Sequence, residues 1–312
     1  MGGLERAPQS PRTLGSAPAK PGRSSIRARI IRGAPGPVSG PGCERSPPLR
    51  ANRLREIWKK GEAVVNGWLS IPSAFSAEVM SHQGFDSLTI DMQHGVVDYQ
   101  VAVTMLQAIS TTSVVPLARV PWNDPARIMK ILDAGAYGII CPMINTRKEA
   151  EALVAAARYY PAGYRSWGPV RASIYAGTDY SPTKANDEIV VMPMIETAEA
   201  VKNIDDILSV PGIDAVYVGP ADLSITLGCT PKLDQTEQPV VEAQQVIAAA
   251  CKRHNVAAGI HCGVSSYALK MIASGYQFVT LASESRMMAA RAADEVAAVR
   301  KSGVSAGKLP AY

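Results

Sequence analysis

The chain has no run of 18 or more apolar residues among its 312 positions. A helix that crosses a bilayer needs about 20 such residues, so we expect no spanning helix and no membrane partner. The five cysteines (Cys43, Cys141, Cys229, Cys251 and Cys262) include no CxxC pair. This spacing argues against a disulfide framework or a zinc knuckle and indicates reduced thiols in a cytoplasmic protein.

Several catalytic signatures are absent as well. The sequence contains no Gly-rich phosphate loop, no GxGxxG fingerprint, no HExxH motif and no nucleophile elbow. We therefore expect none of the phosphate-binding, dinucleotide-binding, zincin or serine-hydrolase chemistries that these motifs support.

An excess of basic residues is confined to the start of the chain. Residues 1–50 hold nine Lys and Arg against two acids, which leaves 23 basic and 25 acidic residues for positions 51–312. The same 50 residues contain nine Pro and eight Gly, too many to build a core. We interpret 1–50 as a disordered extension, a transit-like segment or an early start site, and 51–312 as one domain. The acidic balance of this domain argues against nucleic acid as a partner.

The domain alternates short apolar runs with helix-like segments. Eight continuously apolar runs are present, as expected for strands buried on both faces. They cover residues 64–70, 86–91, 114–120, 138–144, 189–196, 214–219, 256–262 and 278–283. Eight strand–helix units in about 260 residues predict a (β/α)8 barrel, and a doubly wound open sheet is the alternative.

Two segments between the runs have distinct signals. Asp124 followed by Pro125 predicts a helix start, and Gly135 can end that helix. Residues 158–185 are rich in Tyr, Gly and Pro and have no clean periodicity. Because they come after the fourth run, we expect them as a long functional loop over the mouth of the barrel.

Polar residues follow several runs at their carboxyl ends, where barrels of this type carry their active sites. These residues are Asp91, His94, Arg119, Glu196, Asp222 and His261. Glu196 and Asp222 suit a hard divalent cation, although each could simply favour the dipole of the helix that it precedes. His94 is a candidate general base that Asp91 could orient, or a structural histidine.

Arg119 and Asp133 have alternative interpretations too. Arg119 follows an apolar run, which points it to the rim, but it could be a surface ion-pair residue. Asp133 lies in the last turn of its helix, where its charge opposes the dipole. It is either solvated or paired with a cation elsewhere. We take His261 as pocket-lining or structural.

In these residues the sequence resembles the HpcH/HpaI aldolase family of metal-dependent (class II) pyruvate aldolases, including 4-hydroxy-2-oxoheptanedioate aldolases. The resemblance runs through nearly the whole domain. Its motifs are Ile90-Asp91-Met92-Gln93-His94-Gly95, Arg119 with Pro121-Trp122-Asn123-Asp124-Pro125, Leu132-Asp133-Ala134-Gly135, Pro161-Ala162-Gly163-Tyr164-Arg165, Ile195-Glu196-Thr197 and Gly219-Pro220-Ala221-Asp222-Leu223-Ser224. Six such motifs in order are highly specific.

The resemblance implies a role for each matching residue. Glu196 and Asp222 match the family's metal ligands, for which Mg²⁺, Mn²⁺ and Co²⁺ are all suitable. Arg119 matches the arginine that stabilises the enolate oxygen, and His94 matches the base. Asp133 matches the acid that raises the basicity of that histidine, for which contribution from another subunit is one option.

Substrate contacts and assembly are implied in the same way. The backbone of Ala221, beside Gly219, matches a contact to the substrate carboxylate. The family's fold is a barrel of the phosphoenolpyruvate/pyruvate superfamily type, assembled as a homohexamer in which the last helix, here 284–301, is exchanged between subunits. The implied reaction is cleavage of 4-hydroxy-2-oxo acids to pyruvate and an aldehyde, as used in aromatic compound catabolism.

Two positions depart from the family's pattern. Gln93 stands where better-studied members have Glu, and Met194 stands where they have a Gln that contacts substrate. These changes indicate an altered pocket with intact chemistry. No Lys stands at a strand end, which separates this chain from lysine-dependent aldolases. The alternatives are an acyl-CoA lyase or a 2-oxo acid decarboxylase on the same scaffold, or a non-catalytic barrel that serves as a binding module.

Overall fold

The computed structural model describes residues 49–301. Eight parallel strands form a closed barrel in chain order, each paired with its neighbours in sequence and β8 paired with β1. The strands are β1 (Val64–Leu69), β2 (Ser87–Asp91), β3 (Val115–Arg119), β4 (Gly138–Cys141), β5 (Val190–Ile195), β6 (Ala215–Val218), β7 (Ala257–His261) and β8 (Phe278–Ser283). All eight predicted runs are therefore strands, and the barrel prediction is confirmed.

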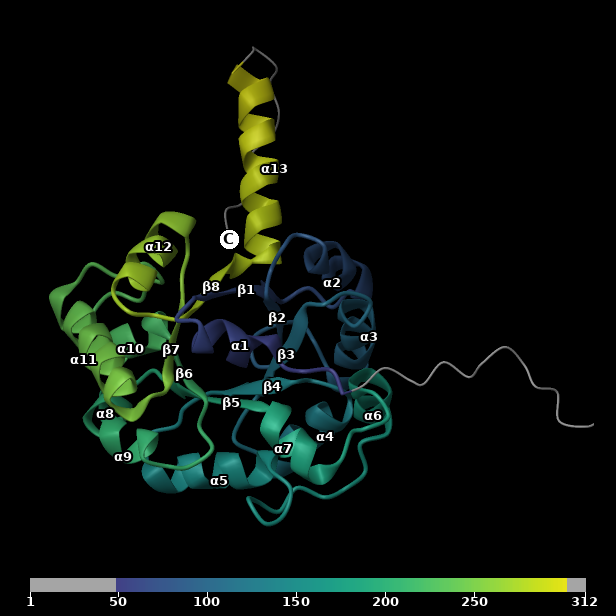
Figure 1. Ribbon diagram of the computed structural model, residues 1–312. Coiled ribbons are helices and arrows are strands. Elements are labelled where there is room, and N and C mark those ends of the chain that lie inside the picture. The colour runs from purple at the N-terminus through teal and green to yellow at the C-terminus, as the bar shows by residue number, and fades with distance from the viewer. Residues whose placement is uncertain (1–48, 302–312) are drawn as a thin grey trace, which may run out of the picture. The chain divides into compact units, whose positions relative to one another are not determined.

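Helices surround the strands (Figure 1). They are α1 (Arg53–Lys59), α2 (Ala74–Ser81), α3 (Tyr99–Ile109), α4 (Pro125–Asp133), α5 (Arg147–Ala157), α6 (Val170–Ala176), α7 (Pro182–Glu188), α8 (Ala198–Lys202), α9 (Ile204–Leu208), α10 (Pro220–Thr226), α11 (Gln238–His254), α12 (Ser265–Ala273) and α13 (Glu284–Lys301). No helix among residues 49–301 is long and apolar enough to cross a membrane. The four cysteines in this range are free, whereas Cys43 and nearly all of the predicted 1–50 extension lie outside it.

The predicted start of α4 is correct in detail. Asp124 is the N-cap, and its carboxylate accepts a hydrogen bond from the Ala126 backbone at 2.9 Å. Pro125 occupies the first helical turn, where its missing N–H costs nothing. Gly135 follows the helix with φ of 103°, a conformation that favours glycine.

Two apolar clusters hold the barrel. Leu117, Tyr217 and Phe278 belong to the cluster inside the strands. Ile90, Leu153 and Ile247 belong to the cluster between strands and helices. Because both faces of each strand are buried, the strand ends are the places where polar side chains reach solvent.

The prediction for residues 158–185 was wrong on two points. This segment contains α6 and α7, where the sequence suggested an irregular loop. The segment also follows α5, which brings the chain from the end of β4 back to the end of the barrel where the strands begin. There Arg158 donates to Asp214, the residue before β6, at 2.9 Å. The segment cannot shape the mouth of its own barrel.

Candidate active site at the carboxyl ends of the strands

The first part of the site is an ion pair between the ends of β2 and β3. The Arg119 guanidinium donates to both carboxylate oxygens of Asp91, at 2.8 and 2.6 Å. Both residues are buried. Burial raises the pKa of Asp91, but the hydrogen bond and charge of Arg119 outweigh this and hold it below its usual value. The pair therefore stays ionised, and the planar guanidinium is fixed in orientation.

An aromatic floor supports this pair. The Trp68 ring, at the end of β1, lies 4.8 Å below the Arg119 guanidinium. Its indole N–H also donates to Asp91 at 3.2 Å. Trp68 thus holds both partners of the ion pair, a role that sequence patterns alone did not reveal.

Asp91 has other partners than the sequence suggested. We expected it to orient the His94 ring, but it accepts hydrogen bonds from Arg119, Trp68 and the backbone N–H groups of Gln93 and His94. A charge-assisted bidentate pair with arginine is stronger than a bond to a neutral imidazole, so Arg119 takes the carboxylate. Asp91 positions the turn that carries His94, whose side chain is exposed.

The second part of the site is the carboxylate of Glu196, directly after β5. It is only 3% exposed and accepts a hydrogen bond from the Met143 backbone at 2.8 Å. Burial raises the pKa of Glu196 to about 7; the Met143 bond opposes the shift, the charge of Asp222 adds to it and Arg119 opposes it. Among residues 49–301 no cation is in salt-bridge contact with this carboxylate.

The local backbone accommodates Glu196 in two ways, with a hydrogen-bond donor at Met143 and with space at Gly219. Met143 adopts a left-handed φ of 58°, which is uncommon for a residue with a side chain and directs its N–H to the carboxylate. A Cβ added at Gly219 would lie 2.4 Å from Glu196 Oε2, so only glycine leaves room for the carboxylate. The left-handed backbone of Met143 and the missing side chain at Gly219 both accommodate this one acid, which indicates a functional site.

The acids Glu196 and Asp222 fit a divalent cation. Asp222 lies in the first turn of α10, exposed and close enough to raise the pKa of Glu196. Two carboxylates are hard oxygen donors, and a cation would remove their repulsion. No cluster of three or more His, Cys, Asp or Glu side chains in the described part of the chain could hold a metal. Two protein ligands would leave coordination positions for substrate and water.

The substrate-binding residues predicted from the resemblance lie at the same rim. Gly219 is the N-cap of α10, and Ala221 is in its first turn, partly buried. Met194 is buried in the barrel, and its Cε would be 3.0 Å from a Cβ at Gly219. A thioether at this position offers an apolar surface where an amide would offer hydrogen bonds.

Within the same subunit, Asp133 lies far from these groups. It ends α4, at the opposite end of the barrel, and forms an ion pair of 2.7 Å with Arg165. Arg165 is buried and also stacks 4.4 Å over the Tyr159 ring. Of the two interpretations of Asp133, the cationic partner is therefore correct, and this partner comes from the segment after α5.

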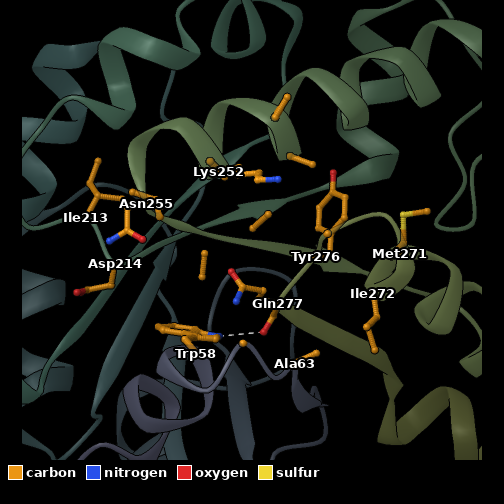
Figure 2. Close-up of a pocket in the computed structure, with 18 of the residues that line it drawn as sticks. Trp58, Ala63, Ile213, Asp214, Lys252, Asn255, Met271, Ile272, Tyr276 and Gln277 are labelled. Atoms are coloured by element: carbon orange, nitrogen blue, oxygen red, sulfur yellow. Dashed lines mark hydrogen bonds between the residues drawn. The ribbon is translucent and has the colours of Figure 1, made fainter.

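A groove of about 1400 Å³ opens at that opposite end. Figure 2 shows Trp58, Asp214, Asn255 and Tyr276 around it, with the Trp58 indole bonded to the Gln277 carbonyl. Its walls are the starts of strands and the ends of helices. In the described residues, the half-buried acid of this groove, Asp214, is already neutralised by Arg55 and Arg158. Among the described residues, the groove therefore has no buried, uncompensated carboxylate like Glu196.

Comparisons with known proteins agree with this geometry. Residues 66–290 match the HpcH/HpaI aldolase/citrate lyase family. The chain is 42% identical to a hydroxypyruvate/pyruvate aldolase of Rhizorhabdus wittichii over 80% of this chain and 99% of that protein. It is 35% identical to an Escherichia coli 4-hydroxy-2-oxo-heptane-1,7-dioate aldolase over 79% of this chain and 94% of that protein.

Solved structures give the same result. An HpcH/HpaI aldolase/citrate lyase family protein of Burkholderia cenocepacia superposes with a TM-score of 0.75 and 30% identity, covering 80% of this chain and all of that one. The citrate synthase SbnG superposes with a TM-score of 0.72 and 29% identity, over 80% of this chain and 98% of that one. The chain therefore belongs to the HpcH/HpaI aldolase/citrate lyase family and is a carbon–carbon lyase.

Proposed function

We propose that this protein is a metal-dependent aldolase that cleaves 4-hydroxy-2-oxo acids, such as 4-hydroxy-2-oxoheptanedioate, to pyruvate and an aldehyde. One observation carries the proposal: the buried acid Glu196, with Asp222 beside it, shares a rim with the fixed guanidinium of Arg119. Carboxylates for a cation and a donor fork for an oxyanion are the two parts that enolate chemistry needs.

Glu196 and Asp222 would hold Mg²⁺, Mn²⁺ or Co²⁺, and the cation would supply Lewis-acid stabilisation of the negative charge that develops on the substrate. His94 takes the proton of the C4 hydroxyl, directly or through water, and its exposed position at the rim suits proton exchange. The C3–C4 bond then breaks to release the aldehyde and leave a pyruvate enolate.

Arg119 donates hydrogen bonds to the oxygen on which the negative charge develops. Asp91 and Trp68 keep its guanidinium from rotating, so little reorganisation is needed during the reaction. The proton held on His94 returns to C3 and completes pyruvate. The backbone of Ala221 and Gly219 binds the substrate carboxylate.

The test is pyruvate release from short 4-hydroxy-2-oxo acids, coupled to lactate dehydrogenase, with protein stripped by EDTA and then resupplied with Mg²⁺ or Mn²⁺. We expect pyruvate only when metal is present. Pyruvate formation that does not depend on metal would contradict the mechanism. No pyruvate from several such acids by a folded, metal-binding protein would favour the second candidate.

That second candidate is a lyase or synthase acting on citrate-like or acyl-CoA substrates, or a 2-oxo acid decarboxylase. The likeness to a citrate synthase at 29% identity supports it. Against the acyl-CoA form, Arg165 and Arg171 donate to groups at the opposite end of the barrel. They are therefore too distant from the mouth of their own subunit to bind CoA phosphates there.

We further propose that the chain works as a homo-oligomer, a hexamer with α13 exchanged between subunits. Figure 1 shows α13 leaving the barrel beside β1 and β8 and projecting away from it. Glu284 anchors its first turn by accepting bonds from the backbone of Ser70 and Ile71 at 2.7 and 2.6 Å. Assembly would also let Asp133, distant from its own His94, reach the His94 of another subunit. Sedimentation and small-angle scattering test the oligomeric state.

A further inference from the structure

Glu284 is a buried acid at the mouth that the proposed mechanism does not use. It follows β8 directly, begins α13 and is 5% exposed. Within residues 49–301, no lysine, arginine or histidine forms a salt bridge with it. A carboxylate that is buried without a cation needs hydrogen bonds from other donors. Those donors therefore indicate the role of this residue.

The donors to Glu284 are backbone N–H groups just after β1. Oε1 accepts from Ser70 and Ile71 at 2.7 and 2.6 Å, and Oε2 lies 2.9 Å from the same Ser70 nitrogen. The pairing of β1 with β8 brings these groups together, because Trp68 pairs with Ser283. Glu284 therefore fixes the backbone that follows the strand carrying Trp68.

The backbone of Ser70 also contacts the turn that carries His94. The Ser70 carbonyl accepts a hydrogen bond from the Val96 backbone N–H at 3.0 Å. A Cβ added at Gly95 would lie 3.2 Å from Ser70 Cα and 2.2 Å from the Asp91 carbonyl oxygen. The turn is therefore packed directly against Ser70, with no room for a side chain between them.

His94 lies between two backbone supports. On one side, the Asp91 carboxylate accepts from the backbone N–H of His94 at 3.2 Å. On the other side, Val96 donates to Ser70, and the N–H of Ser70 donates to Glu284. In the described part of the chain, the exposed His94 side chain makes no hydrogen bond of its own. The two supports therefore set where this side chain stands.

We propose that Glu284 is a positioning residue for the base: through the backbone of Ser70 and Val96, it holds the His94 turn in the place from which proton transfer occurs. The inference rests on the proposed function, in which His94 removes the proton of the C4 hydroxyl. Glu284 itself touches no substrate and acts only through the backbone. Because it is also the first residue of α13, the placement of the base depends on the first turn of that helix.

Two variants of Glu284 and one control test this link. Glu284→Ala removes both acceptor oxygens, whereas Glu284→Gln keeps one oxygen that can accept from both N–H groups. Asp86→Ala is the matched control, because Asp86 accepts from the Val65 backbone N–H at 2.9 Å near the start of β1. Each alanine variant removes an acid that binds the backbone at one end of β1, but only Glu284→Ala frees the end that supports His94.

The measurement is kcat for aldol cleavage divided by kcat for oxaloacetate decarboxylation, with Mg²⁺ or Mn²⁺. Decarboxylation needs no base, so loss of folded protein or of metal lowers both activities alike and leaves the ratio unchanged. We expect the ratio to fall about 10- to 100-fold in Glu284→Ala, because a base displaced by about 1 Å loses roughly that much rate.

The same change should leave KM for the aldol substrate within about threefold, because His94 acts on the transition state. Glu284→Gln and Asp86→Ala should each change the ratio by less than about threefold. All proteins are compared at concentrations where they sediment like the native protein, which excludes an effect of assembly. An unchanged ratio in Glu284→Ala overturns the proposal, and so does an equal fall in Asp86→Ala.

A second readout does not depend on turnover. Hydrogen exchange of the Ser70, Ile71 and Val96 amides should be about tenfold faster in Glu284→Ala than in the native protein, since their hydrogen bonds form one connected set. Asp86→Ala should leave the exchange of Val96 unchanged. Native protection of Val96 in Glu284→Ala overturns the proposal. Faster exchange of Val96, in a protein whose native form shows no aldol cleavage, would refute the aldolase function and leave the link between Glu284 and the turn in place.

Discussion

Both ends of the barrel place acids beside buried arginines, but the acids differ in how their charge is compensated. Where strands begin, Asp214 accepts from Arg55 at 2.6 Å and from Arg158 at 2.9 Å, and Arg158 also donates to the Ile189 carbonyl. Where strands end, the single buried arginine of the site is already bonded to Asp91, and Glu196 has only a backbone donor.

This difference separates stability from chemistry. At the start of the strands, Asp214 is paired with two arginines that make further hydrogen bonds, so its charge is fully compensated within the protein. A buried acid without a cationic side chain is costly, and burial raises the pKa of Glu196 to about 7 for this reason. A protein can keep such an unfavourable buried charge where a bound ligand compensates it. This supports a cation site at Glu196 and gives no reason to expect one at Asp214.

The largest expected effect comes from neutralising one acid at each end with an isosteric amide. Glu196→Gln should lower metal-dependent pyruvate release by about a thousandfold or more, because a metal ligand and its charge are lost. Asp214→Asn should change turnover per folded molecule by less than about threefold. The coupled lactate dehydrogenase assay measures both. Comparable activity losses in the two variants would refute the division between the ends.

His94→Ala tests the chemistry within the mouth. We expect aldol cleavage to fall by about 100- to 10,000-fold, since proton removal from the C4 hydroxyl loses its base. Metal-assisted decarboxylation of oxaloacetate needs no base and should largely remain. Pyruvate formation from the two substrates is compared in the same preparation. Equal loss of both activities would argue against His94 as the base.

Stability should respond in the opposite sense to activity. Asp214→Asn leaves the buried guanidinium of Arg158 without its counter-charge, which we expect to cost about 3 kcal/mol in free energy of unfolding. Glu196→Gln should stabilise the metal-free protein at pH 8, where the native carboxyl is ionised. Denaturant titrations with EDTA give both values. Destabilisation by Glu196→Gln would mean that its charge is compensated.

The smallest effect is a pH dependence that follows from the raised pKa of Glu196. Since metal binds the carboxylate, metal affinity should fall about tenfold per pH unit below pH 7 and level off above it. The folded state holds this proton more tightly than the unfolded state, so without metal the contribution of Glu196 to stability should be full below about pH 4.5 and should decrease by about 3 kcal/mol as the pH rises to 7. Calorimetry and denaturation test this, and Glu196→Gln should abolish both trends.

The sequence predicted the barrel and the rim because both depend on local patterns. Eight apolar runs match eight strands, and Glu196 or Arg119 lies at a strand end by its position alone. The partner of Asp91 was not predictable, because its choice of Arg119 over His94 depends on the register between β2 and β3.

The segment after α5 shows a different kind of failure. Its position was predicted from the strand that it follows, although the intervening helix returns the chain to the other end of the barrel. Ser181 followed by Pro182 could have revealed α7, because Ser is the N-cap and Pro occupies the first turn. A helix of seven residues has too few turns for a periodic signal.

In the proposed homo-oligomer, the projection of α13 would make folding depend on protein concentration. Its 18 residues extend about 27 Å, and almost all of them are exposed in the single chain. A helix with so little packing is marginal in water, so in the proposed homo-oligomer a second subunit would stabilise it. Dilution should therefore reduce helix content and melting temperature together, and a cell that produces little of this chain would hold less of the folded form per molecule.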